Sequence, residues 1–187
     1  MNPIRYTTVS SPTEIEQIQA LQRKNLRVHI GEAVALDQGF LTAEYTIDYL
    51  TRMHEAMPSI IAKDGEMLAG YALVSVQNVR EGHDLIADLF NVIDRTAYKG
   101  RLLKESNYVV VGQLCVAKEY RGRGLVQGLY GHYRDCYADQ FDYLVTDVAQ
   151  ANARSLKAHI KTGFQVIDTL VYGGIPWDLV LWDWRNG

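Results

Sequence analysis

The fold is decided by one stretch of sequence, Arg121-Gly122-Arg123-Gly124-Leu125. It follows an apolar run, Val109 to Val116, that predicts a buried strand, and it opens a helical pattern of apolar residues. Glycines in a strand-to-helix turn let backbone N–H groups approach an anion closely, and the helix N-terminus adds about half a positive charge. The two arginines can form paired hydrogen bonds with phosphate oxygens. The stretch therefore predicts a binding site for a phosphorylated cofactor.

Two other interpretations of this turn are open from the residues alone. The first is a tight surface turn with solvated arginines. The second is a dinucleotide-binding loop, which requires the spacing G-x-G-x-x-G. The third glycine of that spacing would fall on Gln127, whereas Gly128 comes one residue late. The turn also lies deep in the chain, behind a predicted hairpin, rather than after a first βαβ strand.

Length and composition set the broad class. The chain has 187 residues, 48% of them hydrophobic and 22% charged, which predicts a single domain over residues 1–187 with a substantial core. A net charge of −3 gives no electrostatic argument for binding nucleic acid. No apolar run approaches the roughly 20 residues of a membrane span. The N-terminus does not resemble a signal peptide, and we expect a cytoplasmic protein that does not bind membranes.

The periodicity predicts alternating strands and helices. The expected elements are strand 4–9, helix 12 to about 26, loop 28–41, helix 46–56, strands 59–63 and 67–76, a short helix near 84–96, strand 108–116, helix 125 to about 138, strand 143–148, helix 152–161, and strands 164–172 and 177–184. Antiparallel pairing early in the chain, with helix crossovers later, makes this a mixed α/β (α+β) fold.

Several local signals mark the ends of these elements. Ser11 is the expected N-cap of the first helix, with Pro12 at its first position and Glu14 completing a capping box. The pair Asp64-Gly65 indicates a hairpin. Gly163 is the expected C-terminal glycine of the helix that starts at Asn152.

A second motif follows the strand at 143–148. It consists of Asn152, Ser155, His159, Gly163 and Phe164 at fixed spacing. With this motif and the glycine turn in order, each after a strand, the chain resembles the GNAT superfamily of N-acetyltransferases. The resemblance rests on residues 108–164, and the order of elements extends it over nearly the whole chain. It implies a largely antiparallel central sheet that is splayed at an acetyl-CoA site and flanked by helices.

The resemblance also implies which residues bind acetyl-CoA. They are three residues of the splayed strand, the glycine turn with the start of its helix, and the first residue of the second motif: Leu114, Cys115, Val116, Arg121, Gly122, Arg123, Gly124, Leu125, Val126 and Asn152. Backbone N–H groups of the splayed strand would hold the oxyanion that forms during acyl transfer. The chain departs from the family pattern at Val126, where a small residue is usual, at Ser155, where alanine is usual, and at His159, where tyrosine is usual.

His159 bears on the leaving group. The family's tyrosine at this position commonly protonates the departing thiolate, and a histidine could do the same. A thiol of pKa about 8.5 lies only about 1.5 units above neutrality, so this protonation is worth about 2 kcal/mol. The alternative is a helix histidine that packs or contacts solvent without moving a proton.

Asp147 is the candidate general base. The strand 109–116 contains no carboxylate, so one family solution is absent. Ribosomal-protein N-terminal acetyltransferases, which the chain resembles here, carry an acid five residues before the motif asparagine, and that position is Asp147. The alternative is that Asp147 caps the next helix or pairs with an arginine. With one weak base, we expect a preference for weakly basic α-amines over lysine-like amines.

The remaining candidates are weaker. Cys115 could be a nucleophile, but no base is evident beside it, so a small core residue is favoured. Cys115 and Cys136 are expected to be buried thiols in a reducing compartment. His29, His54 and His83 lack ligand spacing, so we expect no metal site.

The sequence therefore predicts an acetyl-CoA-dependent N-acetyltransferase that acts on a primary amine by direct attack on the thioester. The acceptor is expected to be a small molecule or a peptide. One alternative is a domain that binds acyl-CoA without turnover, as a sensor or structural module, and another is a nucleotide-dependent oxidoreductase. The identity of the acceptor stays open, as does whether the chain forms a homodimer.

Overall fold

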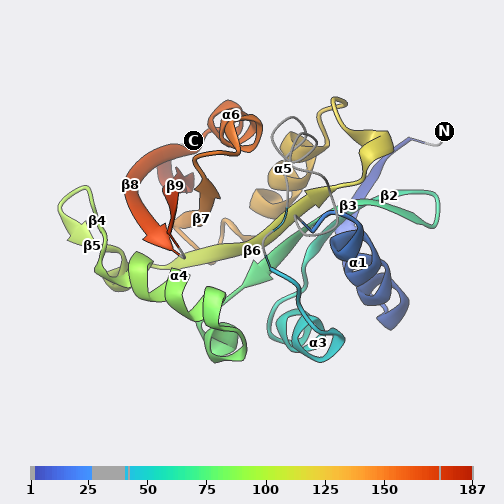
Figure 1. The fold of residues 1–187 in the computed structure, drawn as a ribbon, viewed down its shortest axis with the longest axis horizontal. Coiled ribbons are helices and arrows are strands. Elements are labelled where there is room, and N and C mark those ends of the chain that lie inside the picture. The colour runs from blue at the N-terminus through green and yellow to red at the C-terminus, as the bar shows by residue number, and fades with distance from the viewer. Residues whose placement is uncertain (1–2, 27–40, 42, 173, 187) are drawn as a thin grey trace.

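One seven-stranded sheet organises the structure, a computed structural model that describes residues 3–26, 41, 43–172 and 174–186 (Figure 1). The strand order is β1-β2-β3-β6-β7-β9-β8. The strands are β1 (Arg5–Thr8), β2 (Ile60–Asp64), β3 (Met67–Ser75), β6 (Tyr108–Val116), β7 (Tyr143–Ala149), β8 (Gln165–Tyr172) and β9 (Ile175–Asp183). The helices are α1 (Pro12–Lys24), α3 (Ile47–Ala56), α4 (Asp84–Arg95), α5 (Leu125–Tyr137) and α6 (Ala153–Thr162). The mixed α/β architecture expected from the sequence is confirmed.

Neighbouring strands of this sheet run antiparallel, with one exception. Strands β6 and β7 are parallel, and they pair only from Tyr108 opposite Tyr143 to Val110 opposite Val145. Beyond that point both strands continue but no longer pair. The Oγ1 of Thr146 donates a hydrogen bond to the Val111 carbonyl at 2.9 Å, which satisfies that carbonyl where the strands part. The sheet is therefore splayed open at its centre, as the resemblance implied.

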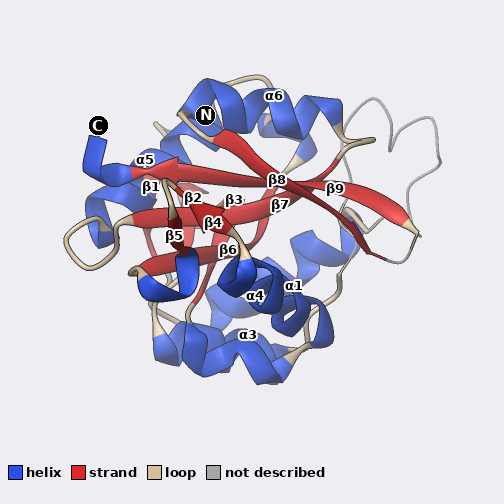
Figure 2. Cartoon of the chain, turned by 90° about the vertical axis from the view of Figure 1, so that its left-hand side faces the viewer, coloured by secondary structure: helices blue, strands red, loops and turns tan. Residues whose placement is uncertain are grey.

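Helices cover both faces of the sheet. Figure 2 shows α5 and α6 on one side and α1, α3 and α4 on the other. Most residues of β2, β3 and β6 are buried on both faces of the sheet, which accounts for their mainly apolar sequences, although β2 also carries Lys63 and Asp64. The core includes several tyrosines whose hydroxyls reach carbonyl groups, such as Tyr133 to Val110 at 3.1 Å.

The capping signals account for the helix starts, with one correction. The Ser11 side chain accepts a hydrogen bond from the Glu14 N–H, as an N-cap should. The Glu14 carboxylate, however, accepts from the N–H of Ser10 at 2.7 Å rather than from that of Ser11. It also pairs with the buried Lys63 ammonium at 2.8 Å. Glu14 therefore ties the start of α1 to β2 instead of closing a standard capping box.

The hairpin predicted around Asp64-Gly65 joins β2 to β3, and its turn residues are Gly65 and Glu66. The first helix was expected to extend to about residue 26, which is Leu26. Leu26 lies beyond the end of α1, is buried, and forms an isolated bridge with Leu41. The expected loop at 28–41 falls outside the described residues except for Leu41.

A long insertion separates the adjacent antiparallel strands β3 and β6. Residues 76–107 form the 3₁₀ helix η2 (Gln77–Gly82), then α4, and then a small hairpin of β4 (Ala97–Tyr98) and β5 (Arg101–Leu102). The sequence predicted α4 but not the hairpin. Its strands are two residues long, too short for a visible alternation, and the turn signal is confined to Lys99 and Gly100, which both have positive φ.

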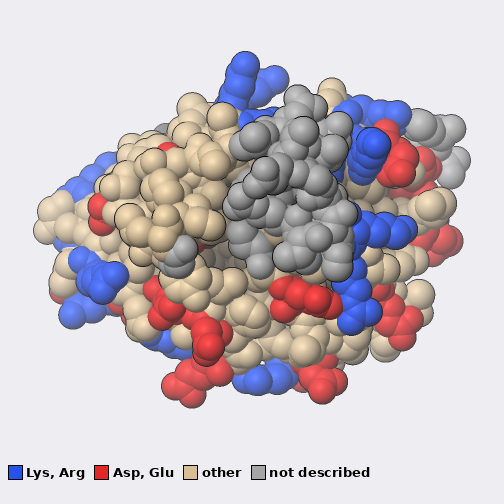
Figure 3. All heavy atoms as spheres, viewed as in Figure 1, with Lys and Arg blue, Asp and Glu red and all other residues tan. Residues whose placement is uncertain are grey.

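The surface is mixed in charge. On the face shown in Figure 3, basic and acidic side chains are interspersed rather than gathered into one patch. Among the described residues, no helix is long and apolar enough to cross a membrane.

Candidate active site

The opening between β6 and β7 is the centre of the candidate site. Two cavities meet there, one of about 330 Å³ beside the glycine turn and one of about 610 Å³ on the side of α4. The first is called the turn cavity below and the second the α4 cavity. Residues shared by both linings mark the junction: Leu41, Leu114, Asn152, Ser155 and His159. A ligand in the turn cavity can therefore extend through the splay to meet a second molecule in the α4 cavity.

The backbone of β6 presents hydrogen-bond donors to this opening. The Ala117 N–H donates to the Ala69 carbonyl of β3 at 2.9 Å. Because N–H groups alternate in direction along an antiparallel strand, the Leu114 and Val116 N–H groups point away from β3, toward the opening. The Cys115 N–H points toward β3. Of the three strand residues that the resemblance assigned to the acetyl-CoA site, Leu114 and Val116 thus present amides to the opening, while Cys115 lines the turn cavity without doing so.

A β-bulge at Gly112 sets the local shape of β6. Leu73 of β3 faces Gln113 and Val74 faces Val111, so Gly112 is the extra residue. A Cβ at this position would lie 2.5 Å from the Ser75 Oγ, so only glycine fits. The Gly112 carbonyl accepts a hydrogen bond from the Tyr45 hydroxyl at 3.1 Å. Sequence reasoning missed Gly112, although a glycine inside an apolar strand is a signal for a bulge.

The glycine turn has the geometry of an anion cradle. Gly122 and Gly124 adopt φ of 77° and 79°, a region that other residues rarely occupy. Gly124 is the N-cap of α5, and the Gly128 N–H makes the helix's first backbone bond, to the Gly124 carbonyl. The N–H groups of the first turn, including that of Val126, therefore remain available at the edge of the turn cavity.

The two arginines of the turn have different surroundings. The Arg121 Nε donates to the Val116 carbonyl at 3.1 Å, and its guanidinium also binds the Asn25 side chain. Arg121 thus fastens the turn to the end of β6 while still lining the turn cavity. The Arg123 guanidinium lies over the ring of Tyr120, 5.6 Å from its centroid.

Two cations that the sequence analysis did not select lie across the cavity from the turn. Arg154 and Lys161, both from α6, line the turn cavity. They are seven residues apart, or two helical turns, so they lie on the same face of α6. That spacing was a usable signal, but it becomes meaningful only once the splay places α6 opposite α5.

Asn152 begins α6. Its Oδ1 accepts a hydrogen bond from the Ser155 N–H at 3.3 Å, so it is the N-cap, and it lines both cavities. Because Asn152 caps the helix that carries Ser155 and His159, its spacing from these two motif residues is set by the helix.

His159 lies at the junction but is 5% exposed. Its Nδ1 is 2.8 Å from the Ser155 carbonyl oxygen, which can only accept, so Nδ1 carries the hydrogen. Its Nε2 is 2.6 Å from the hydroxyl of the buried Tyr130, which therefore donates to it. Burial lowers the pKa of His159, and the imidazole is neutral at pH 7. Proton donation by His159 thus requires an imidazolium form that burial disfavours.

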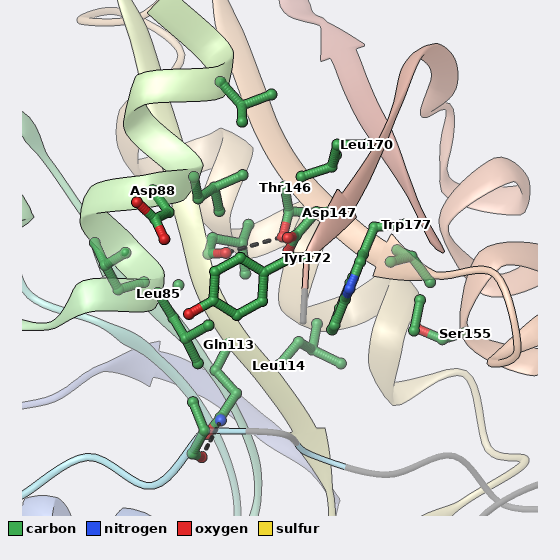
Figure 4. A pocket seen from close by; sticks show the side chains of 18 of the residues that line it. Leu85, Asp88, Gln113, Leu114, Thr146, Asp147, Ser155, Leu170, Tyr172 and Trp177 are labelled. Atoms are coloured by element: carbon green, nitrogen blue, oxygen red, sulfur yellow. Dashed lines mark hydrogen bonds between the residues drawn. The ribbon is translucent and has the colours of Figure 1, made fainter. Parts of the chain in front are cut away.

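Asp147 lies on β7, one residue beyond the point of the splay, and lines the α4 cavity (Figure 4). Burial raises its pKa to about 6, and the hydrogen bond from its own N–H opposes that rise. Within the described residues its carboxylate has no ion-pair partner. The cap of α6 is Asn152 rather than Asp147. Neither alternative role considered for Asp147 is found in the described part of the chain.

Gln113 is a further polar residue of the opening. Its Oε1 accepts hydrogen bonds from the Tyr71 hydroxyl at 2.6 Å and from the Gln22 amide at 2.8 Å. Its Nε2 donates to the Ala43 carbonyl at 2.9 Å. This network links β6 to α1 and to the segment that carries Tyr45. The network holds the Gln113 amide in one orientation, and an amide cannot act as a general acid or base.

The remaining candidates are structural. Burial raises the pKa of the Cys115 thiol to about 12, so it is not a thiolate at neutral pH. Both Cys115 and Cys136 are free, and Cys136 is only partly buried rather than buried as expected. Among the described residues, no group of three or more His, Cys, Asp or Glu could hold a metal ion.

Comparison with known proteins identifies the class of this site. The sequence pattern described as the Acetyltransferase (GNAT) family matches residues 30–164. The chain therefore belongs to the GNAT acetyltransferase family and is an acyltransferase. None of the curated protein sequences matches the chain.

Solved structures share the fold at low sequence identity. A GNAT-family acetyltransferase from Streptococcus agalactiae has a TM-score of 0.65 at 18% identity, covering 96% of this chain and 95% of that one. The ribosomal-protein-S18-alanine N-acetyltransferase of Escherichia coli has a TM-score of 0.63 at 11% identity, covering 96% and 93%. The protein yncA of Salmonella typhimurium, solved with its cofactor acetyl-CoA, has a TM-score of 0.64 at 14% identity, covering 98% and 95%.

Proposed function

We propose that residues 1–187 form one domain that transfers an acetyl group from acetyl-CoA to a primary amine by direct attack on the thioester. The observation that carries the proposal is the meeting of two cavities at the splay. One has an anion cradle at its edge, and the other has a carboxyl group with a raised pKa in its wall. The yncA structure, which holds acetyl-CoA on the same fold, supports the assignment of the turn cavity.

The residues of the turn cavity fit a CoA group. The first-turn N–H groups of α5 would bind the pyrophosphate, with Gly122 and Gly124 allowing close approach. Arg154 and Lys161 would bind phosphate from the opposite side. The Leu114 and Val116 N–H groups would hold the acyl oxygen. Acetyl-CoA supplies an activated thioester, and the chain supplies the donors that orient it.

On the acceptor side, Asp147 would take a proton from the ammonium group of the acceptor, directly or through a water, and the neutral amine that results would attack the thioester. A pKa near 6 leaves the carboxylate about 90% ionised at pH 7 and close to the working pH, which favours base catalysis. His159 is proposed to protonate the leaving thiolate from its imidazolium form, and burial, which disfavours that form, keeps this contribution modest. The free cysteines fit a reducing, cytoplasmic environment.

Binding at the turn cavity is tested by the shift in melting temperature on adding CoA. At 100 times the dissociation constant, CoA should stabilise the protein by about 2.7 kcal/mol. Gly124→Glu should abolish the shift, whereas Gly131→Glu, on the same helix with open space around it, should keep it.

A charge reversal on α6 avoids the backbone strain of Gly124→Glu. Arg154→Glu should weaken CoA binding, because the side chain lines the turn cavity. Lys157→Glu is the matched control, since it is exposed on the same helix outside that lining. Equal shifts in all four variants would overturn the assignment of the site.

Turnover separates catalysis from binding alone. A broad panel of amines with acetyl-CoA should release CoA in the wild type. A protein that binds CoA tightly and releases none with any amine would instead be an acyl-CoA-binding module, the alternative considered from the sequence.

A further inference from the structure

The insertion between β3 and β6 builds one wall of the α4 cavity. Apolar residues of α4, including Leu85, Leu89 and Val92, line the cavity from one side. Leu170 and Tyr172 of β8 and Trp177 of β9 line it from another (Figure 4). These residues give the cavity an apolar and aromatic part, although polar side chains such as Asn91, Gln113 and Asp147 make up about as much of its lining. A small amine alone would leave most of its roughly 610 Å³ unfilled.

Trp177 adds an unused hydrogen-bond donor. Its Nε1 is buried and has no hydrogen-bond partner among the described residues, and its indole faces the cavity in Figure 4. Buried indole N–H groups normally find an acceptor. This donor is therefore available to a ligand that brings a carbonyl or similar oxygen into the cavity.

The charges of the lining are unbalanced. Among the described residues it contains three carboxyl groups, Asp88, Asp147 and Asp168, against the single guanidinium of Arg95. Asp168 already accepts hydrogen bonds from the Thr96 hydroxyl and the Thr169 N–H. Asp88 of α4 projects toward the cavity beside Tyr172 (Figure 4), and no described residue forms an ion pair or hydrogen bond with its side chain. Asp88 can therefore pair with a cation that enters the cavity.

Taken together, these walls point to one class of acceptor. We propose that the acceptor is an amine with a bulky apolar or aromatic body and a second cationic group, with Asp88 binding that group and Tyr172 packing against the body. This inference rests on the proposed function, because the α4 cavity is taken as the acceptor site. A second positive charge also lowers the pKa of a nearby amine, which favours the neutral, reactive form.

Four α-amines of one design test this class. Norleucinamide and argininamide have aliphatic side chains, neutral and cationic. Phenylalaninamide and 4-guanidinophenylalaninamide are the aromatic pair. A guanidinium is not acetylated at neutral pH, so each compound has one reactive amine. All four carry a carbonyl oxygen for the Trp177 donor. The measurement is kcat/KM for CoA release at fixed acetyl-CoA.

The expected order places each guanidino compound above its neutral partner, by up to about fivefold, because Asp88 is exposed. Asp88→Asn should remove that advantage and leave the neutral amides unchanged. Asp84→Asn is the matched control, because Asp84 is exposed one turn earlier on α4 and does not line the cavity. It should behave as the wild type.

The aromatic pair should exceed the aliphatic pair, and Tyr172→Ala should reduce the difference. Val166→Ala, exposed on the same strand but outside the cavity, is its control. Equal kcat/KM for neutral and guanidino amides, or an advantage that survives Asp88→Asn, would overturn the proposal while leaving the acetyltransferase assignment intact.

Calorimetry of argininamide and norleucinamide binding to the CoA-loaded protein reports on the cavity without turnover. Tighter binding of argininamide that depends on Asp88 would support the class even in an inactive protein. Equal binding would overturn it. The absence of CoA release with every amine would count against the proposed function instead.

Discussion

Asp147 is the residue on which the proposed chemistry depends most. Asp147→Asn should lower kcat/KM by about 100-fold or more, since general-base catalysis typically contributes at least that factor. In the wild type, kcat/KM should fall as the pH drops through about 6, because the protonated carboxyl cannot accept a proton. A pH–rate profile of both proteins from pH 5 to 9 checks this. A mutant that retains the acidic limb of the profile would assign that limb to another group.

The same carboxyl has a predictable effect on stability. Burial raises its pKa from 3.8 to about 6, so the folded state binds the proton more tightly than the unfolded state does. The resulting stabilisation is complete below about pH 4 and is lost as the pH rises through 6. Asp147→Asn carries no charge and should be more stable than the wild type at pH 7, by up to about 3 kcal/mol. The difference should vanish at pH 4, measured by urea unfolding at both values.

His159 should be a modest contributor to rate. Protonating a thiolate is worth about 2 kcal/mol, so His159→Ala should lower turnover by at most about 30-fold and leave CoA affinity nearly unchanged. ¹⁵N NMR of the wild type at pH 7 should show hydrogen on Nδ1, because the Ser155 carbonyl requires it. Wild-type turnover in the mutant from pH 6 to 9 would assign His159 to packing with Tyr130 and Phe164.

The central strand β6 depends on a single glycine. Gly112→Ala should destabilise the protein by about 1 to 3 kcal/mol and slow turnover, since its Cβ would meet the Ser75 Oγ at 2.5 Å and distort the bulge. Ser75→Ala removes that oxygen, which is buried without a partner, so alone it should be neutral or slightly stabilising.

The double variant should therefore recover part of the loss caused by Gly112→Ala. Denaturant unfolding of both single variants and the double variant measures this coupling. Simple additivity of the two effects would show that the clash with Ser75 is not the source of the strain.

Element by element, most of the chain could be predicted. Helices with caps, such as α1 after Ser11 and α6 after Asn152, begin where their side chains indicate. The parallel pairing of β6 and β7, and its end at Val110, could not be read from the chain, because a mainly apolar run predicts a strand but not its partner, its direction or the length of its pairing. The proposed phosphate contacts of Arg154 and Lys161 depend on that splay, so the sequence alone did not indicate them.

At the scale of the whole molecule, Asp147 is the one carboxyl group of the α4 cavity that is proposed as a base. At pH 7, a lysine-like amine of pKa about 10.4 is neutral in only about 1 part in 2500, which costs about 5 kcal/mol, whereas an α-amine of pKa about 7.8 costs about 1 kcal/mol. We therefore expect higher kcat/KM for α-amines than for matched ε-amines at pH 7, with a smaller gap at pH 9. A lysine-like amine with the higher kcat/KM at pH 7, and with the same kcat/KM in Asp147→Asn, would contradict both the preference for α-amines and the role of Asp147 as base.

The sequence alone indicated one of the two cavities but not the other. The turn cavity could be predicted because a backbone anion site needs glycines at fixed spacing, and that spacing can be read directly from the sequence. The α4 cavity, the proposed acceptor site, could not be predicted, because its walls come from α4, β8 and β9, which lie far apart in the chain. Asp88 and Trp177 become candidate binding residues only once the fold places both in the lining of the α4 cavity.

The insertion at 76–107 contributes residues to the α4 cavity and none to the turn cavity, among the described residues. It joins two strands that are already neighbours, so its removal would leave the sheet order unchanged. Loop-closure entropy rises by only about 0.6 kcal/mol for each doubling of length, so the length of this connection alone costs the fold little. Its buried residues, among them Phe90 and Ile93, belong to the core of the whole domain, so any replacement must fill the same places. A change in this one connection would alter the α4 wall of the cavity, while the walls from β8 and β9 and the glycine turn would stay as they are.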